Sequence, residues 1–142
     1  MKERVEVLIS EADVDRKIEE IGKKITEDYA GKSVHVICVL KGGAFFMCEL
    51  AKRIEVPVSM DFMAVSSYGS GTESAGSIKM IKDLDESIEG KDVLIVEDIV
   101  DSGRTLSKLI ELLKTRKPAS MKVCTLLDKP DRRVVDVHVD FT

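Results

Sequence analysis

Acidic and small polar residues are concentrated in the segment VLIVEDIVDSGRTL, residues 93–106. Its apolar first part is typical of a buried strand, and its last part, from Gly103, is typical of a helix start. A short loop that enters a helix points main-chain N–H groups at one spot, where the helix dipole adds positive potential. Ser102 and Thr105 supply hydroxyl donors, and Gly103 lets the main chain approach a ligand closely. These features predict a cradle for a monophosphate group, since the P-loop lysine of a triphosphate site is missing.

Three carboxylates, Glu97, Asp98 and Asp101, stand beside this predicted cradle. They would repel a phosphate unless other groups lie between them. Ribose hydroxyls can donate to carboxylates, and Mg²⁺ can bridge them to pyrophosphate oxygens. The pair Glu97-Asp98 alone would be taken for a solvated acidic turn. The whole run instead favours a site for a phosphorylated sugar and a metal ion.

The elements that must position these residues follow from the apolar pattern. Apolar runs or alternating residues predict strands at 34–40, 56–65, 78–84, 93–96, 121–127 and 135–141. Helical spacing of apolar residues predicts helices after Ser10, after Gly43 and from Gly103 to Leu113. Strands separated by helices predict an α/β domain with a mainly parallel open twisted sheet flanked by helices. No repeat or linker interrupts the chain, so we expect a single domain over residues 1–142.

Ligands of open α/β sheets bind beyond the carboxyl ends of the strands. Two further segments stand at such ends: Lys41-Gly42-Gly43, and the Gly- and Ser-rich run from Ser66 to Ser77. The first alone is equally typical of a plain strand-to-helix turn. The second alone would be taken for a linker, although its composition also suits a loop that closes over a site and excludes water.

The composition narrows the class of protein. The 142 residues are 44% hydrophobic and 34% charged with a net charge of −4, which argues against a general nucleic-acid binder. We expect no membrane span and no signal peptide, since no segment is apolar enough for either. The three cysteines match no metal or redox spacing, and their odd number suits a reducing compartment. These observations predict a cytoplasmic protein.

The segment VLIVEDIVDSGRTL, together with VLKGGAFF and SSYG upstream, resembles the type I phosphoribosyltransferases, most of all their bacterial hypoxanthine-guanine branch. The resemblance runs over nearly the whole chain. It implies transfer of a phosphoribosyl group from 5-phosphoribosyl-1-pyrophosphate to a 6-oxopurine, with Mg²⁺ as cofactor and no nucleic-acid or membrane partner. It also implies a homodimer or homotetramer.

The resemblance also implies roles for the acidic residues and the phosphate loop. Glu97 and Asp98 would hold the ribose hydroxyls and the magnesium ion. Asp101 would be the general acid/base near N7 of the purine. The 5-phosphate would be bound by Ser102, Gly103, Arg104 and Thr105.

The remaining implied roles fall on three other segments. Lys41 and Gly42 would contact pyrophosphate, and the Leu40–Lys41 peptide bond would be cis. Ser67 and Tyr68 would lie on the loop that closes over the site. Lys129, in the sequence LLDKP, would donate to the exocyclic oxygen of the purine.

The chain ends at Thr142, whereas family members continue for a few dozen residues. We therefore expect the hood over the purine to be incomplete and the phosphoribosyl-pyrophosphate half of the site to be complete. Three alternatives stay open: a non-catalytic phosphoribosyl-pyrophosphate or nucleotide sensor, an enzyme inactivated by truncation, and an enzyme for xanthine or a pyrimidine. The preference between hypoxanthine and guanine is also open.

Overall fold

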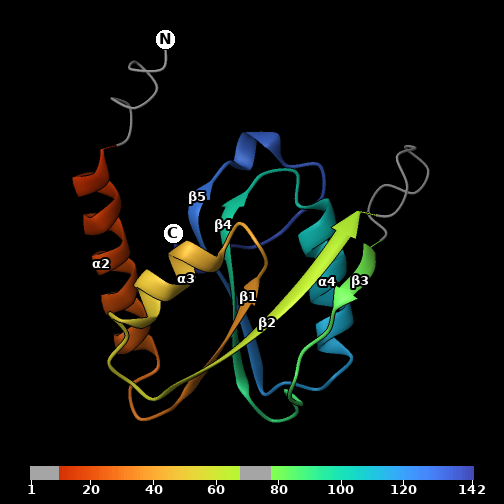
Figure 1. Ribbon diagram of the computed structural model, residues 1–142, viewed down its shortest axis with the longest axis horizontal. Helices are drawn as coiled ribbons and strands as arrows, with labels where there is room; N and C mark the ends of the chain where they lie inside the picture. The colour runs from red at the N-terminus through yellow and green to blue at the C-terminus, as the bar shows by residue number, and fades with distance from the viewer. Residues whose placement is uncertain (1–9, 68–77) are drawn as a thin grey trace.

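The computed structural model describes residues 10–67 and 78–142 of the chain. Helices and strands alternate along most of it (Figure 1). In chain order the elements are α2 (Glu11–Asp28), β1 (Val34–Val39), α3 (Ala44–Ala51), β2 (Val58–Ser67), β3 (Ile78–Lys82), β4 (Asp92–Val100), α4 (Arg104–Lys114), β5 (Ser120–Asp128) and the 3₁₀ helix η2 (Pro130–Arg132).

Within the described residues, the strands form one sheet in the order β3-β2-β1-β4-β5. The strands β2, β1, β4 and β5 are parallel, and β3 joins the edge antiparallel to β2. From β1 the chain continues to β2 on one side, whereas from β4 it continues to β5 on the other. The strand order therefore reverses between β1 and β4, which is where open α/β sheets bind their ligands. The predicted α/β fold with a mainly parallel sheet is confirmed.

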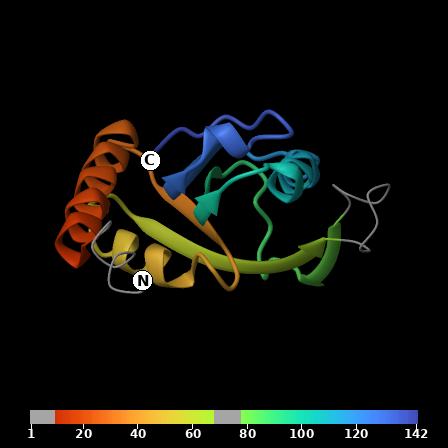
Figure 2. The same ribbon diagram turned by 90° about the horizontal axis from the view of Figure 1, so that it is seen from above.

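Helices cover both faces of this sheet, and Figure 2 shows α3 and α4 on opposite sides of it. The helix α2 begins at the N-cap Ser10, whose hydroxyl accepts from the N–H of Asp13, and packs a buried stripe beside α3: Ile18, Ile21 and Ile25. The helix α4 packs its own stripe on the other face: Leu106, Leu109 and Leu113. Among the described residues, no helix is long and apolar enough to span a membrane.

The strand β4 is longer than predicted. We expected it to end before the acidic pair, but it runs to Val100. The reason is its neighbour β5, which continues the parallel ladder past the pair, to Ile99 opposite Leu127 and Val100 opposite Asp128. Glu97 and Asp98 therefore lie inside a paired strand, where the ladder fixes their main chain.

The predicted strand at 135–141 is wrong. The N–H groups of Val134 and Val135 donate to the carbonyl of Ser102, at 2.8 and 3.1 Å. These two N–H groups are therefore bonded to the loop before α4 and cannot pair with a neighbouring strand. Only an isolated bridge between Phe141 and Cys124 of β5 pairs this segment with the sheet.

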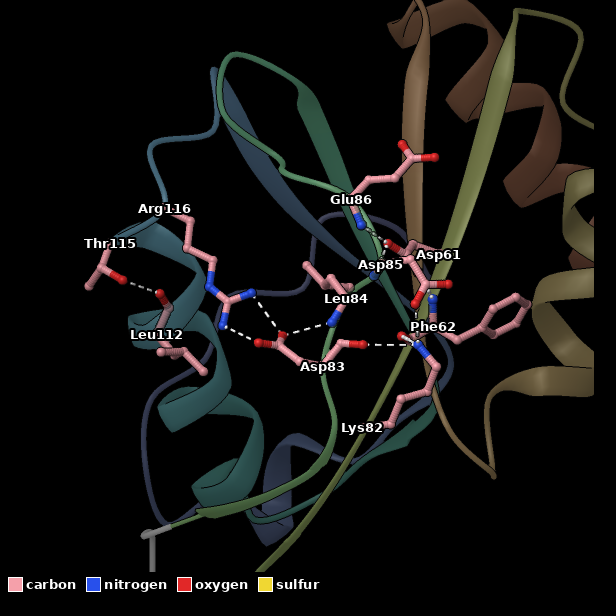
Figure 3. Close-up of polar contacts among 10 residues, drawn as sticks. All are labelled: Asp61, Phe62, Lys82, Asp83, Leu84, Asp85, Glu86, Leu112, Thr115 and Arg116. Atoms are coloured by element: carbon pink, nitrogen blue, oxygen red, sulfur yellow. Dashed lines mark hydrogen bonds and ion pairs between the residues drawn. The ribbon is translucent and has the colours of Figure 1, made fainter.

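The connection between β3 and β4 is held by a buried carboxylate. Asp61 of β2 is 3% exposed, and its Oδ2 accepts from the N–H groups of Asp85 and Glu86 at 2.9 and 3.1 Å. Its Oδ1 accepts from the N–H of Phe62 at 2.8 Å. Figure 3 shows this group beside the ion pair of Asp83 with Arg116, which ties the same connection to the end of α4.

Candidate active site

The carboxyl ends of the parallel strands bring most of the predicted site residues to one edge of the sheet, the upper side of Figure 1. Lys41 follows β1, Ser67 ends β2, Glu97 and Asp98 lie near the end of β4, and Lys129 follows β5. The main chain of Ser67 pairs with Ile78 of β3. Tyr68 and the rest of the predicted closing loop, residues 68–77, lie outside the described residues.

The ends of β1 and β4 meet at the reversal of the strand order. A Cβ atom added to Gly42 would lie 2.9 Å from Oδ1 and 3.0 Å from Oδ2 of Asp98. Only a residue without a side chain leaves this carboxylate in place. The peptide bond between Leu40 and Lys41 is cis, as the family resemblance implied.

The acidic group has an unusual electrostatic state. Glu97 is half-buried, and loss of solvation, followed by repulsion from Asp98 and Asp101, raises its pKa to about 8. Oδ1 of Asp98 accepts from the N–H of Ile99 at 2.8 Å, which leaves Oδ2 free of any hydrogen bond found within the described residues. A site that disfavours a third negative charge this strongly is one that a cation or hydroxyl donors would stabilise.

Gly103 shapes the loop between β4 and α4. Its φ is +83°, in the left-handed region, and it is the N-cap of α4. Behind it, a Cβ atom would lie 2.7 Å from the carbonyl oxygen of Val135. A pocket of about 90 Å³ lies in front of the loop, and its lining includes Glu97, Asp101, Ser102 and Thr105. Two hydroxyl residues, Ser102 and Thr105, and the start of a helix thus border one small space, an arrangement that suits a phosphate.

Asp101 lies exposed at the start of this loop. Its Oδ1 accepts from the N–H of Ser102 at 2.6 Å, so the carboxylate is folded against its own loop. Arg104 is the first residue of α4, and its side chain is exposed. Both side chains are therefore accessible to a ligand at the pocket.

Lys129 is tied through its main chain to the last residue of β4, just before the loop. Its N–H donates to the carbonyl oxygen of Val100 at 2.9 Å, and its side chain is exposed. This hydrogen bond places the main chain of Lys129, the residue predicted to recognise the base, next to the end of β4, two residues before the predicted phosphate-binding residue Ser102.

Sequence reasoning missed one residue at this site, Arg133. Its side chain is 14% exposed and donates to the carbonyl oxygens of Val100 and Asp101, where β4 meets the loop predicted to bind phosphate. Nothing in the sequence separates it from its exposed neighbour Arg132. Only the path of the chain around η2 buries Arg133 and leaves Arg132 exposed.

The donor set also fits a magnesium ion. Mg²⁺ is usually bound through one or two carboxylates, with waters and substrate phosphates completing the shell. Glu97, which borders the small pocket, and its neighbour Asp98 supply two carboxylates. Over residues 10–67 and 78–142, no group of three or more His, Cys, Asp or Glu side chains is arranged to hold a metal ion. Oxygens of the substrate and of water would therefore complete the coordination.

Comparison with known proteins identifies the family of the chain. Residues 10–142 match the phosphoribosyl transferase domain family. The hypoxanthine-guanine phosphoribosyltransferase of Streptococcus thermophilus is 50% identical, over 99% of this chain and 78% of that protein. The hypoxanthine phosphoribosyltransferase of Salmonella typhimurium is 52% identical, over 99% of this chain and 80% of that protein.

A solved structure extends the likeness to three dimensions. The crystal structure of a hypoxanthine-guanine phosphoribosyltransferase from Bacillus anthracis superposes with a TM-score of 0.90 at 44% identity, and covers 94% of this chain and 79% of that one. Sequence and fold agree, and the chain belongs to the phosphoribosyl transferase domain family.

Proposed function

We propose that this protein is a hypoxanthine-guanine phosphoribosyltransferase of purine salvage. It transfers the 5-phosphoribosyl group from phosphoribosyl pyrophosphate to N9 of hypoxanthine or guanine. The bond from N9 to the anomeric carbon forms, the bond from that carbon to pyrophosphate breaks, and IMP or GMP leaves with pyrophosphate.

One observation supports the proposal: the acidic pair of β4 lies beside Gly42 at the reversal of the strand order, and the loop after β4 borders a small pocket. The Gly42 main chain lies against Asp98, and Lys129 donates from its main chain to Val100, just before the loop. A phosphorylated sugar needs the acidic pair and the loop, and a 6-oxopurine presents an acceptor to the lysine. Relatives about 50% identical that are named for this activity support the same assignment.

The chain's own residues would act as follows. The N–H groups and hydroxyls of Ser102–Thr105, with Arg104, bind the 5-phosphate, while Glu97 and Asp98 accept from the ribose hydroxyls. Lys41 and the main chain of Gly42 neutralise and orient the pyrophosphate as negative charge develops on it. Asp101 accepts the proton that the purine loses as its N9 bonds to the sugar. Lys129 donates to the exocyclic oxygen of the base, and Ser67 and Tyr68 belong to the loop that excludes water.

Glu97 and Asp98 would also hold the magnesium ion. When bound, Mg²⁺ supplies positive charge to the leaving pyrophosphate. The raised pKa of Glu97 supports this assignment, since a carboxyl that is poorly solvated and repelled by its neighbours gains most from a nearby cation.

We further propose a cytoplasmic homodimer or homotetramer whose residues 1–142 form one phosphoribosyltransferase domain. Three large apolar side chains are exposed: Phe45 of α3 at 69%, Met60 of β2 at 50% and Ile81 of β3 at 61%. Figure 1 shows β2 and β3 with no helix in front of them. Exposed apolar residues on an uncovered sheet face are typical of contacts between subunits. The free thiols of Cys38, Cys48 and Cys124 suit a reducing compartment.

The proposal is tested by pyrophosphate release in the presence of magnesium and phosphoribosyl pyrophosphate, with hypoxanthine, guanine, xanthine and adenine offered separately. We expect release with hypoxanthine or guanine. Release with xanthine alone would overturn the substrate assignment. Magnesium-dependent binding of phosphoribosyl pyrophosphate without release for any base would make the protein a binder and not a transferase. Absence of both would overturn the assignment of residues 97–105.

A further inference from the structure

Arg133 joins the phosphate loop to the segment after β5. Its Nη1 donates to the carbonyl oxygens of Asp101 at 3.0 Å, Val100 at 3.2 Å and Lys129 at 3.4 Å. Its Nη2 donates to Oδ1 of Asp128 at 2.6 Å. The side chains of Arg133 and Asp128 are only 14% and 21% exposed. This half-buried charge pair connects the end of β4 to the segment after β5. Breaking it would leave a poorly solvated charge unpaired, so we expect the two segments to stay in place relative to each other.

Main-chain hydrogen bonds from the two residues after Arg133 hold the following peptide group of the loop, between Ser102 and Gly103. The carbonyl of Ser102 accepts from the N–H groups of Val134 and Val135, at 2.8 and 3.1 Å. The carbonyls of two consecutive residues, Asp101 and Ser102, therefore both point toward the segment 133–135.

In a planar trans peptide the C=O and the N–H point in opposite directions, so these two carbonyls also fix the directions of the N–H groups of Ser102 and Gly103. Both peptide bonds are trans, so the N–H of Ser102 points away from Arg133, and that of Gly103 points away from Val134. The carboxylate of Asp101 accepts from this N–H of Ser102 and so lies on the side of the loop opposite Arg133. The Asp101–Ser102 and Ser102–Gly103 peptides and the Asp101 carboxylate are therefore held from the side of residues 133–135.

We propose that Arg133 is a positioning residue that fixes the Asp101–Ser102 peptide at the start of the proposed phosphate loop, and with it the Asp101 carboxylate, although Arg133 touches no substrate itself. This role deepens the proposed function and rests on it. The requirement is geometric, since the flat guanidinium reaches three carbonyls and a carboxylate at once. A lysine has the same charge but donates from a single nitrogen and cannot span these acceptors.

The test compares Arg133→Met and Arg133→Lys with the control Arg132→Met, whose side chain is exposed on η2. Steady-state kinetics give kcat and the KM values for phosphoribosyl pyrophosphate and hypoxanthine. Calorimetry gives the Kd of IMP, which carries the 5-phosphate, and of inosine, which lacks it. Thermal melting reports on the fold of each variant.

We expect Arg133→Met to lower kcat/KM for phosphoribosyl pyrophosphate by about 10- to 100-fold, the range for loss of charged hydrogen bonds. The Kd of IMP should rise by a similar factor, whereas that of inosine and the KM for hypoxanthine should change little. Arg133→Lys should recover only part of the loss, and Arg132→Met should behave as the wild type.

Two results would overturn the role of Arg133. One is equal weakening of IMP and inosine, which indicates general loss of structure. The other is wild-type kinetics in Arg133→Met. Both are distinct from failure of the proposed function, in which the wild-type protein itself would release no pyrophosphate.

Discussion

Gly42, in the turn after β1, lies in contact with Asp98 of the neighbouring parallel strand β4, where a Cβ atom on Gly42 would stand 2.9 Å from Oδ1 of Asp98. That oxygen also accepts from the N–H of Ile99 at 2.8 Å, so a shift of the carboxylate would disturb this hydrogen bond. The two halves of the proposed site, for pyrophosphate and for ribose, therefore share one contact.

This contact makes Gly42→Ala a test of the site. We expect the added methyl group to displace the Asp98 carboxylate and to lower kcat/KM for phosphoribosyl pyrophosphate by at least about tenfold, with a small effect on stability. Gly31→Ala is the control, since Gly31 has a φ of +80° and no atom within 4 Å of its Cβ position. The control should lose stability through backbone strain and keep its activity. Kinetics and thermal melting of both variants check the prediction, which fails if Gly42→Ala is fully active.

Asp101→Asn should separate chemistry from binding. The amide keeps the shape of the side chain but cannot accept the purine proton, so we expect kcat to fall by about 10²- to 10⁴-fold. The Kd of phosphoribosyl pyrophosphate should change little. Single-turnover kinetics and calorimetry measure the two quantities, with Asp131→Asn on the exposed η2 as the matched control. Equal turnover in Asp101→Asn would remove this residue from the mechanism.

Lys129→Met should act on the base rather than on the sugar. Loss of a charged donor to the exocyclic oxygen should raise the KM for hypoxanthine by about tenfold or more, with the KM for phosphoribosyl pyrophosphate nearly unchanged. Lys32→Met, which removes an exposed lysine from the turn after α2, serves as the control. If both KM values rise together, Lys129 orders the whole site and does not read the base.

Asp61→Ala should weaken the fold without touching the chemistry. The change leaves three N–H groups, those of Phe62, Asp85 and Glu86, without their acceptor in the group that Figure 3 shows. A buried donor without a partner costs about 1–3 kcal/mol, so we expect the free energy of unfolding to fall by at least about 2 kcal/mol. Urea unfolding measures the loss. Asp85→Ala, whose side chain is 77% exposed, should cost far less, and kcat should persist in both variants.

The ion pair of Asp83 with Arg116 predicts a pH dependence of stability. Hydrogen bonds from Arg116 hold the pKa of Asp83 below its usual value of 3.8. A carboxyl whose pKa is lower in the folded state stabilises the fold above the unfolded pKa, and this contribution is lost as the pH falls through the folded pKa. Because Asp83 is 48% exposed, solvent screening limits the effect to about 1 kcal/mol or less.

Asp83→Asn tests this dependence by urea unfolding from neutral pH down to about pH 3. The wild-type protein should be the more stable at neutral pH, and the difference should shrink once the pH falls below 3.8. A difference that is constant over the whole range would mean that the pair contributes through packing and not through charge.

The sequence by itself determined the fold class and most of the proposed site. Apolar runs of the right length identify β1 and β5, and helical spacing identifies α2 and α4, because these patterns reflect burial on a sheet or on one helix face. The run from Glu97 to Thr105 carries its chemistry within nine consecutive residues, so no long-range contact is needed to recognise it.

Tertiary structure decided the features that depend on which segments become neighbours. The alternation at 135–141 predicted a strand, yet Val134 and Val135 donate to Ser102, because the loop before α4 lies within reach and offers a carbonyl. The acidic pair lies within β4 because β5 continues the ladder beside it. Two adjacent arginines have the same chemistry in the sequence, and only the turn after β5 buries Arg133 against the phosphate loop and leaves Arg132 in solvent.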